Sequence, residues 1–192
     1  MRTVKEPDIR KQEILEGAIR VFANKGYENT SISDIAKELN ISQGLCYRYY
    51  PSKETIFYAA LDEYAEYIVN RNIADYDFNT ANLKEQIYKL SGHVVNYIKL
   101  EKEHPEFYQL FHNSESNSKH DQLFLCIAKK LIPFITKVLI QAKQKGEISV
   151  SNPEATAYFF VYGQMGLLMD KELDTNDKIK LIQDCLIELL NL

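Results

Sequence analysis

Glycine, proline and cysteine are scarce in this sequence, and each shortage excludes a class of structure. Seven glycines and five prolines in 192 residues are too few for the many tight turns of a sheet-rich architecture. The three cysteines, Cys46, Cys126 and Cys185, lie too far apart for a CxxC metal or redox motif. An odd number of cysteines without a secretory signal is typical of reduced thiols in a cytosol.

Long apolar segments are also missing. The longest stretch without a charged residue covers residues 155–169, and these 15 residues are fewer than the ~20 that span a bilayer. Residues 1–8 are polar and charged and lack the apolar centre of a secretory signal. We therefore expect a cytoplasmic protein that makes no membrane contact.

Catalytic and cofactor motifs are absent as well. The sequence contains no G-x-S-x-G, HExxH, P-loop or G-x-G-x-x-G pattern. Its four histidines, His93, His104, His112 and His120, form no close pair with a cysteine. We predict no enzymatic activity, no cofactor and no metal site. The net charge of −4 does not by itself indicate a nucleic-acid partner.

Helical periodicity runs through nearly the whole chain. In the first segment, apolar residues recur with the spacing of one helical stripe, from Ile14 to Phe22, and Gly26 follows as a C-terminal stop. Pro105 and Pro153 suit first-turn positions, and Pro133 should kink or divide its helix. The predicted helices cover residues 8–25, 32–39, 43–50, 53–75, 80–102, 105–112, 119–145, 153–170 and 175–191.

These elements predict an all-α fold of about nine helices. Residues 1–55 are expected to form an N-terminal three-helix domain with a helix-turn-helix, and residues 56–192 a C-terminal helical bundle. Ser31 and Asp34 resemble a capping box, Asn40 suits the left-handed turn, and Ser42 caps the third helix. The fourth helix enters the bundle without a flexible linker.

The third helix has a small, polar and aromatic face, which suits the major groove of DNA. Helix N-termini at Thr30/Ser31, Ser42 and Ser52 offer N–H groups to phosphates. Gly44 permits close backbone approach. The apolar anchors of this helix are Leu45, Cys46 and Tyr50, and its DNA-facing candidates are Ser42, Gln43, Gly44, Tyr47, Arg48 and Tyr49.

This stretch resembles the TetR family of transcriptional regulators. The resemblance rests on Thr30-Ser31, Ile35-Ala36, Ser42-Gln43-Gly44, Tyr47-Arg48-Tyr49-Tyr50 and Ser52-Lys53-Glu54 and covers residues 9–60. Leu45 departs from the pattern, since Thr or Asn is common there. The resemblance implies base-edge contacts for Gln43 and Leu45, phosphate contacts for Tyr47, Tyr49 and Lys53, and either contact for Arg48.

The C-terminal part is rich in tyrosine, and buried tyrosine hydroxyls need partners, which favours a pocket with an apolar body. The candidate effector contacts are Tyr64, Ile68, Tyr97, Phe111, Phe124, Tyr158 and Tyr162. The last two helices are broadly apolar. The resemblance implies that they form a four-helix homodimer interface, with Gly163, Gly166, Leu186 and Leu189 as its candidate residues.

The expected function is therefore that of a dimeric regulator, a repressor by resemblance, which binds a palindromic double-stranded DNA operator and is released by a small, mostly apolar effector. The alternative is a helical protein-interaction module whose N-terminal domain binds protein instead of DNA. Salt dependence distinguishes the two, because phosphate contacts weaken steeply with salt.

Overall fold

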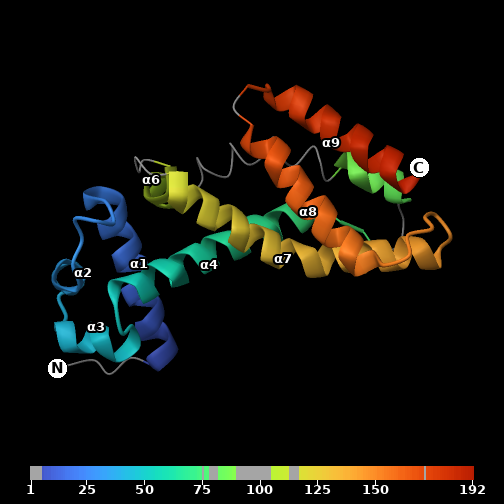
Figure 1. The fold of residues 1–192 in the computed structure, drawn as a ribbon. Helices are drawn as coiled ribbons and strands as arrows, with labels where there is room; N and C mark the ends of the chain where they lie inside the picture. The colour runs from blue at the N-terminus through green and yellow to red at the C-terminus, as the bar shows by residue number, and fades with distance from the viewer. Residues whose placement is uncertain (1–5, 75, 78–81, 90–104, 113–116, 171) are drawn as a thin grey trace. The chain divides into compact units, whose positions relative to one another are not determined.

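The computed structural model describes residues 6–74, 76–77, 82–89, 105–112, 117–170 and 172–192. None of these residues forms a strand, and most lie in helices (Figure 1), so the all-α prediction is confirmed. Residues 83–89 are helical. The other helices are α1 (Pro7–Lys25), α2 (Ile32–Glu38), α3 (Gln43–Tyr49), α4 (Lys53–Ile73), α6 (Pro105–His112), α7 (Asn117–Gln144), α8 (Pro153–Met169) and α9 (Thr175–Leu190).

Two compact units divide the chain. The first contains residues 1–64 and 101–123, and the second contains residues 65–100 and 124–192. Both α4 and α7 therefore contribute residues to each unit. The predicted functional division after residue 55 remains a prediction, since compactness does not show which residues bind DNA. Among the described residues, no helix combines the length and the apolar character needed to cross a membrane.

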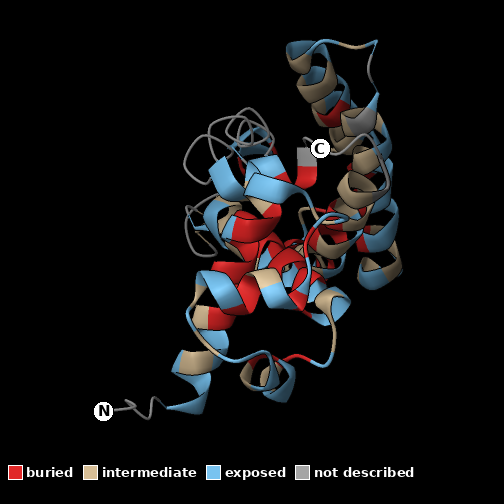
Figure 2. Cartoon of the chain, turned by 90° about the vertical axis from the view of Figure 1, so that its left-hand side faces the viewer, coloured by how far each residue is buried: buried red, intermediate tan, exposed pale blue. Residues whose placement is uncertain are grey.

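The core of the first unit is built on one side of α1. Ile14, Ala18 and Phe22 are almost fully buried, while neighbouring positions on the other side are exposed, as in the other helices (Figure 2). α1 packs against α2 and α6. The approach to α2 is close: a Cβ added at Gly17 would lie 2.7 Å from Cδ2 of Leu39. Glycine at position 17 therefore allows α2 to reach α1.

Aromatic rings join α6 to α4 within the same unit. The ring of Tyr64 lies almost parallel to those of Phe107 and Phe111, with centroid distances of 4.5 and 5.7 Å. Phe111 also contacts Phe57, one of the first apolar residues of α4, at 5.7 Å. Because Phe107 and Phe111 are four residues apart on α6, they lie on one face and can both pack on α4.

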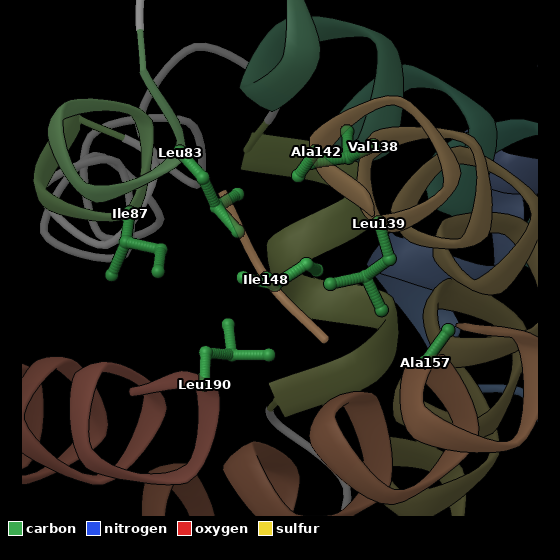
Figure 3. Close-up of a cluster of buried hydrophobic side chains, with 8 residues drawn as sticks. All are labelled: Leu83, Ile87, Val138, Leu139, Ala142, Ile148, Ala157 and Leu190. Carbon is green, nitrogen blue, oxygen red and sulfur yellow. The ribbon is translucent and has the colours of Figure 1, made fainter. Parts of the chain in front are cut away.

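The second unit has its own apolar core (Figure 3). Side chains from the helix at 83–89, α7, α8 and α9 meet in one cluster, which consists of Leu83, Ile87, Val138, Leu139, Ala142, Ile148, Ala157 and Leu190. Leu186 and Phe160 pack against it from α9 and α8. This arrangement buries the apolar stripes of four helices at once, and such burial is the main stabilising term in a helical bundle.

Two of the predicted helices compare with the structure as follows. α7 continues through Pro133, so the predicted division does not occur, while the alternative of a kink stays a prediction. Of the helix predicted at 80–102, only residues 82–89 are described, and 83–89 are helical. Residues 90–102, including Tyr97, lie outside the described residues.

Candidate nucleic-acid interface

Local hydrogen bonds set the two short helices of the helix-turn-helix. Ser31 begins α2 with the predicted capping box, because its hydroxyl accepts from the Asp34 amide and the Asp34 carboxylate accepts from the Ser31 amide. Asn40 has a φ of 51°, so the predicted left-handed turn is confirmed. The Ser42 hydroxyl then accepts from the Leu45 amide and starts α3. The order and bounds of both helices thus follow from neighbouring residues.

One face of α3 is held by the protein. Cys46 and Tyr50 are buried, and the Tyr50 hydroxyl donates to the carbonyl oxygen of Lys11 at 3.4 Å. Leu45 and Tyr49 are half-buried, so their side chains are partly used in packing. The exposed face of α3, which comprises Gln43, Gly44, Tyr47 and Arg48, remains available together with its capping residue Ser42.

Gly44 lies in open space on that exposed face. No heavy atom lies within 4 Å of the position that a Cβ would occupy there. Glycine lowers helix stability relative to alanine, and neither backbone conformation nor packing within this chain requires it. The predicted close approach of a binding surface to Gly44 is compatible with this open space and stays a prediction.

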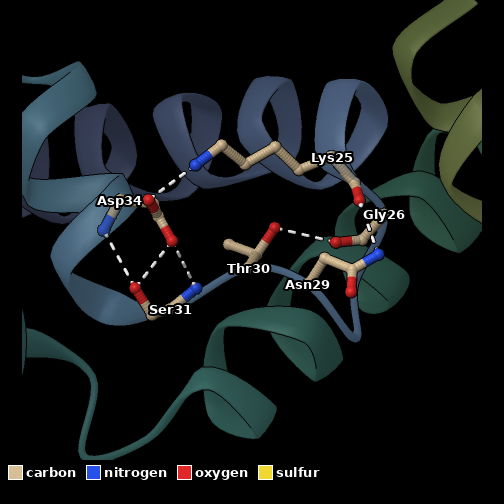
Figure 4. A network of polar contacts seen from close by, with 6 residues as sticks. All are labelled: Lys25, Gly26, Asn29, Thr30, Ser31 and Asp34. Atoms are coloured by element: carbon tan, nitrogen blue, oxygen red, sulfur yellow. Dashed lines mark hydrogen bonds and ion pairs between the residues drawn. The ribbon is translucent and has the colours of Figure 1, made fainter.

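Thr30 and Ser31 differ in what they can offer a phosphate. Thr30 is 3% exposed, its hydroxyl donates to the Gly26 carbonyl at 2.8 Å, and its amide donates to the Tyr27 carbonyl at 3.2 Å. Both donors of Thr30 are therefore used within its own turn. Ser31 is exposed at the N-terminus of α2, where its hydroxyl also donates to Asp34 at 2.6 Å (Figure 4).

Asp34 links this N-terminus to α1. Its carboxylate accepts from the Lys25 ammonium at 2.6 Å (Figure 4), and this hydrogen bond, followed by those from Ser31, holds the pKa of Asp34 well below its ordinary value of 3.8. A depressed pKa means that ionised Asp34 stabilises the folded state above the unfolded pKa, and that this stabilisation is lost as the pH falls toward the folded pKa.

We therefore expect Asp34→Asn to lower the melting temperature at pH 7, and the deficit to shrink as the pH is lowered below about 4. Lys25→Met should produce a similar deficit at pH 7 and add little to Asp34→Asn. Thermal unfolding of the two single variants and the double variant measures this coupling. A deficit that stays constant from pH 7 to pH 2 would show that the carboxylate charge is irrelevant.

Lys53 has a structural role that sequence reasoning missed. Its ammonium donates to the carbonyl oxygens of Tyr27 and Glu28, at 2.7 and 3.3 Å, and lies 4.3 Å from the centroid of the Tyr27 ring. Lys119 at the start of α7 lies over the same ring at 4.8 Å. No sequence signal reveals a bond to distant backbone carbonyls. The predicted phosphate contact of Lys53 stays a prediction, and its test must allow for this second role.

Lys53→Met keeps the aliphatic chain and removes the ammonium. We expect the free energy of unfolding to fall by about 1–2 kcal/mol, since two carbonyl bonds and one cation–π contact are lost. Lys37→Met, at an exposed position of α2, is the matched control and should change the free energy of unfolding by less than about 0.5 kcal/mol. Urea unfolding followed by circular dichroism measures both. Equal stability of wild type and Lys53→Met would mean that the Tyr27 contacts contribute nothing.

Comparison with known proteins agrees with this geometry. The profile of the N-terminal domain of bacterial regulatory proteins of the tetR family matches residues 14–60, which contain the whole helix-turn-helix. The N-terminal part of the chain is therefore similar to the TetR family. The all-α fold with an N-terminal helix-turn-helix is the one predicted, and the TetR resemblance is confirmed.

Curated relatives of this chain are named as transcriptional regulators. The uncharacterized HTH-type transcriptional regulator YuxN of Bacillus subtilis is 46% identical over 55 residues, which are 29% of this chain and 19% of YuxN. The biofilm operon icaADBC negative transcriptional regulator IcaR of Staphylococcus epidermidis is 31% identical over 93 residues, 47% of this chain and 50% of IcaR. The matches thus span half or less of these relatives, which are named as transcriptional regulators and not as enzymes.

Solved structures extend the likeness to the rest of the chain. A TetR-family transcriptional regulator from Pectobacterium atrosepticum aligns over 97% of this chain and 96% of its own, with a TM-score of 0.62 and 15% identity. At this identity the likeness shows the fold alone. The C-terminal helices of this chain therefore share the fold of that solved structure.

The predicted effector residues that the structure describes fall into separate groups. Tyr64 and Phe111 are buried together in the first unit, where their rings are parallel. Ile68, buried, and Phe124, half-buried, belong to the second unit. Tyr158 and Tyr162 are exposed on α8, where their rings lie 6.4 Å apart. The structure thus brings together two pairs, and the set as a whole stays a prediction.

The predicted dimer residues lie on α8 and α9, which pack against each other. Gly163 and Gly166 are exposed, and no heavy atom lies within 4 Å of the position that a Cβ would take at either, so the backbone of α8 is open to a neighbour there. Leu189 is 66% exposed and Phe159 79% exposed, whereas Leu186 packs against the core of the second unit. Leu189 is therefore the better position for testing an interface.

Proposed function

We propose that this TetR regulator binds a palindromic DNA operator as a homodimer and releases it when a small, mostly apolar effector binds to the C-terminal domain. In this proposal residues 1–55 bind DNA and residues 56–192 sense the ligand and dimerise. The DNA-binding part of this proposal rests on the exposed face of α3, where the backbone at Gly44 is open to an approaching surface. An α-helix fits the major groove, and residues near its N-terminus reach the base edges.

Gln43, Tyr47 and Arg48 are the exposed hydrogen-bonding side chains of this face. We assign base contacts to Gln43 and Leu45. Tyr47, Tyr49 and Lys53 are assigned to phosphates, Arg48 to either, and the N-termini at Ser31 and Ser42 add backbone donors. Repression, as opposed to activation, is supported by the name of IcaR as a negative regulator.

Selection of bound sequences from random duplex DNA is the experiment that tests this function. A palindromic consensus with half-sites about 34–36 Å apart is the expected result, because two recognition helices related by two-fold symmetry meet successive major-groove faces. Failure to enrich any sequence, together with weak salt dependence of residual binding, would favour the alternative of a protein-binding helical module.

Effector release is tested by reciprocity. An effector that lowers operator affinity a hundredfold needs to prefer the non-binding conformation by only about 2.7 kcal/mol, and operator DNA must then weaken effector affinity by the same factor. Effectors found by thermal-shift screening are titrated with and without operator. Identical effector affinities in the two titrations would contradict allosteric release while leaving DNA binding intact.

A further inference from the structure

Gln86 is a buried polar side chain in the second unit. It lies on the helix at 83–89 and is 1% exposed, whereas most buried side chains of the described residues are apolar. Burying a carboxamide away from water is unfavourable unless both its nitrogen and its oxygen find hydrogen-bond partners. A buried Gln86 therefore needs a hydrogen-bond acceptor for its Nε2 and a hydrogen-bond donor for its Oε1.

Only the nitrogen of Gln86 has a partner there. Its Nε2 donates to the carbonyl oxygen of Asp77 at 3.1 Å, and no group of the described residues bonds to its Oε1. The orientation of the amide is set by chemistry, since a carbonyl oxygen only accepts and the nitrogen must face it. Oε1 therefore points elsewhere, as a buried acceptor with no donor among the described residues.

The helix that carries Gln86 also supplies apolar side chains to the core of the second unit. Leu83 and Ile87 belong to the core cluster of Figure 3. Tyr76, beside Asp77, packs edge-on against Phe134 with a centroid distance of 5.1 Å, and burial, with Glu147 as a smaller cause, raises the pKa of Tyr76 to about 12. A buried acceptor in such a core is stabilised when water or a ligand donates to it.

We propose that Oε1 of Gln86 anchors the effector, and that the effector carries a hydrogen-bond donor, a hydroxyl or an N–H group, on an otherwise apolar body. This inference rests on the proposed function, which requires an effector, and it names the chemistry of that effector. A donor on the ligand satisfies the acceptor, and the apolar remainder packs against side chains of the same unit.

The location also suits a regulatory ligand. Asp77, which accepts from Gln86, lies four residues beyond Ile73, where α4 ends. α4 itself begins at Lys53, three residues after Tyr50, the C-cap of α3. A ligand that binds Gln86 therefore contacts the side chain that holds the segment following α4.

Matched probe pairs test the proposal. Phenol and anisole, indole and N-methylindole, and naphthol and methoxynaphthalene each differ by a methyl group that removes the donor and keeps the rings. Isothermal titration of the full chain measures their affinities for wild type, Gln86→Met and the control Gln144→Met, an exposed glutamine of α7. At least one donor should bind wild type and Gln144→Met about tenfold more tightly than its methylated partner.

In Gln86→Met this preference should fall to within about twofold, because methionine cannot accept the donor with comparable strength. If Gln86→Met fails to fold, the side-chain amide resonances of Gln86 in wild type provide the readout, and they should shift with the donor but not with the methylated probe. A probe set in which no donor is preferred, or a preference that survives in folded Gln86→Met, overturns the proposal.

Operator binding is also measured in the same preparations, without probes. It distinguishes failure of the Gln86 ligand site from failure of the proposed DNA-binding function. Intact DNA binding with no donor preference means that the Gln86 site is wrong while the regulator stands. A donor preference that depends on Gln86 in a protein that binds no DNA means that the proposed function fails while the ligand site stands.

Discussion

Gly44→Ala is expected to make the protein more stable and its DNA binding weaker. Alanine is favoured over glycine by about 0.5–1 kcal/mol inside a helix, which is an upper limit for Gly44 in the first turn of α3, and the structure leaves open space for the added Cβ. Bound to DNA, the same methyl group would stand between the α3 backbone and the groove. We expect operator affinity to fall about 10- to 100-fold, the range that corresponds to losing one good base-edge contact.

Thermal unfolding and fluorescence anisotropy on the selected operator measure the two effects of Gly44→Ala. Asn24→Ala is the control, since it introduces alanine at an exposed position of α1 away from the exposed face of α3. It should leave operator affinity unchanged. An unaltered affinity of the stabilised Gly44→Ala variant would mean that α3 does not approach DNA through this residue.

Leu189→Glu is expected to convert the dimer to a monomer of about the chain mass of 22.3 kDa. Leu189 is 66% exposed in the single chain, so a glutamate is well solvated there and the fold should survive. In a closely packed interface the same carboxylate would lose its water without gaining a partner. Operator affinity should then fall about 100-fold or more, because two half-sites are no longer bound by one linked pair of recognition helices.

Analytical ultracentrifugation at micromolar concentration measures the assembly. Asn176→Glu introduces the same charge on α9 about 140° around the helix from Leu189 and should leave the dimer intact. Leu186 is unsuitable as a test position, since it packs against the core of the second unit and its substitution would disturb the fold. Wild type sedimenting only as a 22.3 kDa species would refute the dimer.

The helices could be predicted because their ends are set by residues three or four positions away. The Ser31–Asp34 capping box, Ser42 at the start of α3, Gly26 after α1 and the prolines that open α6 and α8 are all local signals, and all lie at or next to the observed ends. The family motif lies in the same local segment, so the sequence by itself determined the all-α class, the helix-turn-helix and the TetR family.

The roles of single side chains depended on distant partners, and only the tertiary structure decided them. Lys53 bonds to the carbonyl of Tyr27, 26 residues earlier, and the Tyr50 hydroxyl donates to the carbonyl of Lys11, 39 residues earlier. The sequence does not indicate a role for Gln86. Its Oε1 is left as a buried acceptor only because, in the folded chain, Nε2 donates to the carbonyl oxygen of Asp77. An amphipathic pattern shows which stripe of a helix is buried. The hydrogen-bond partner of each polar side chain, however, depends on which segments pack together in the folded chain.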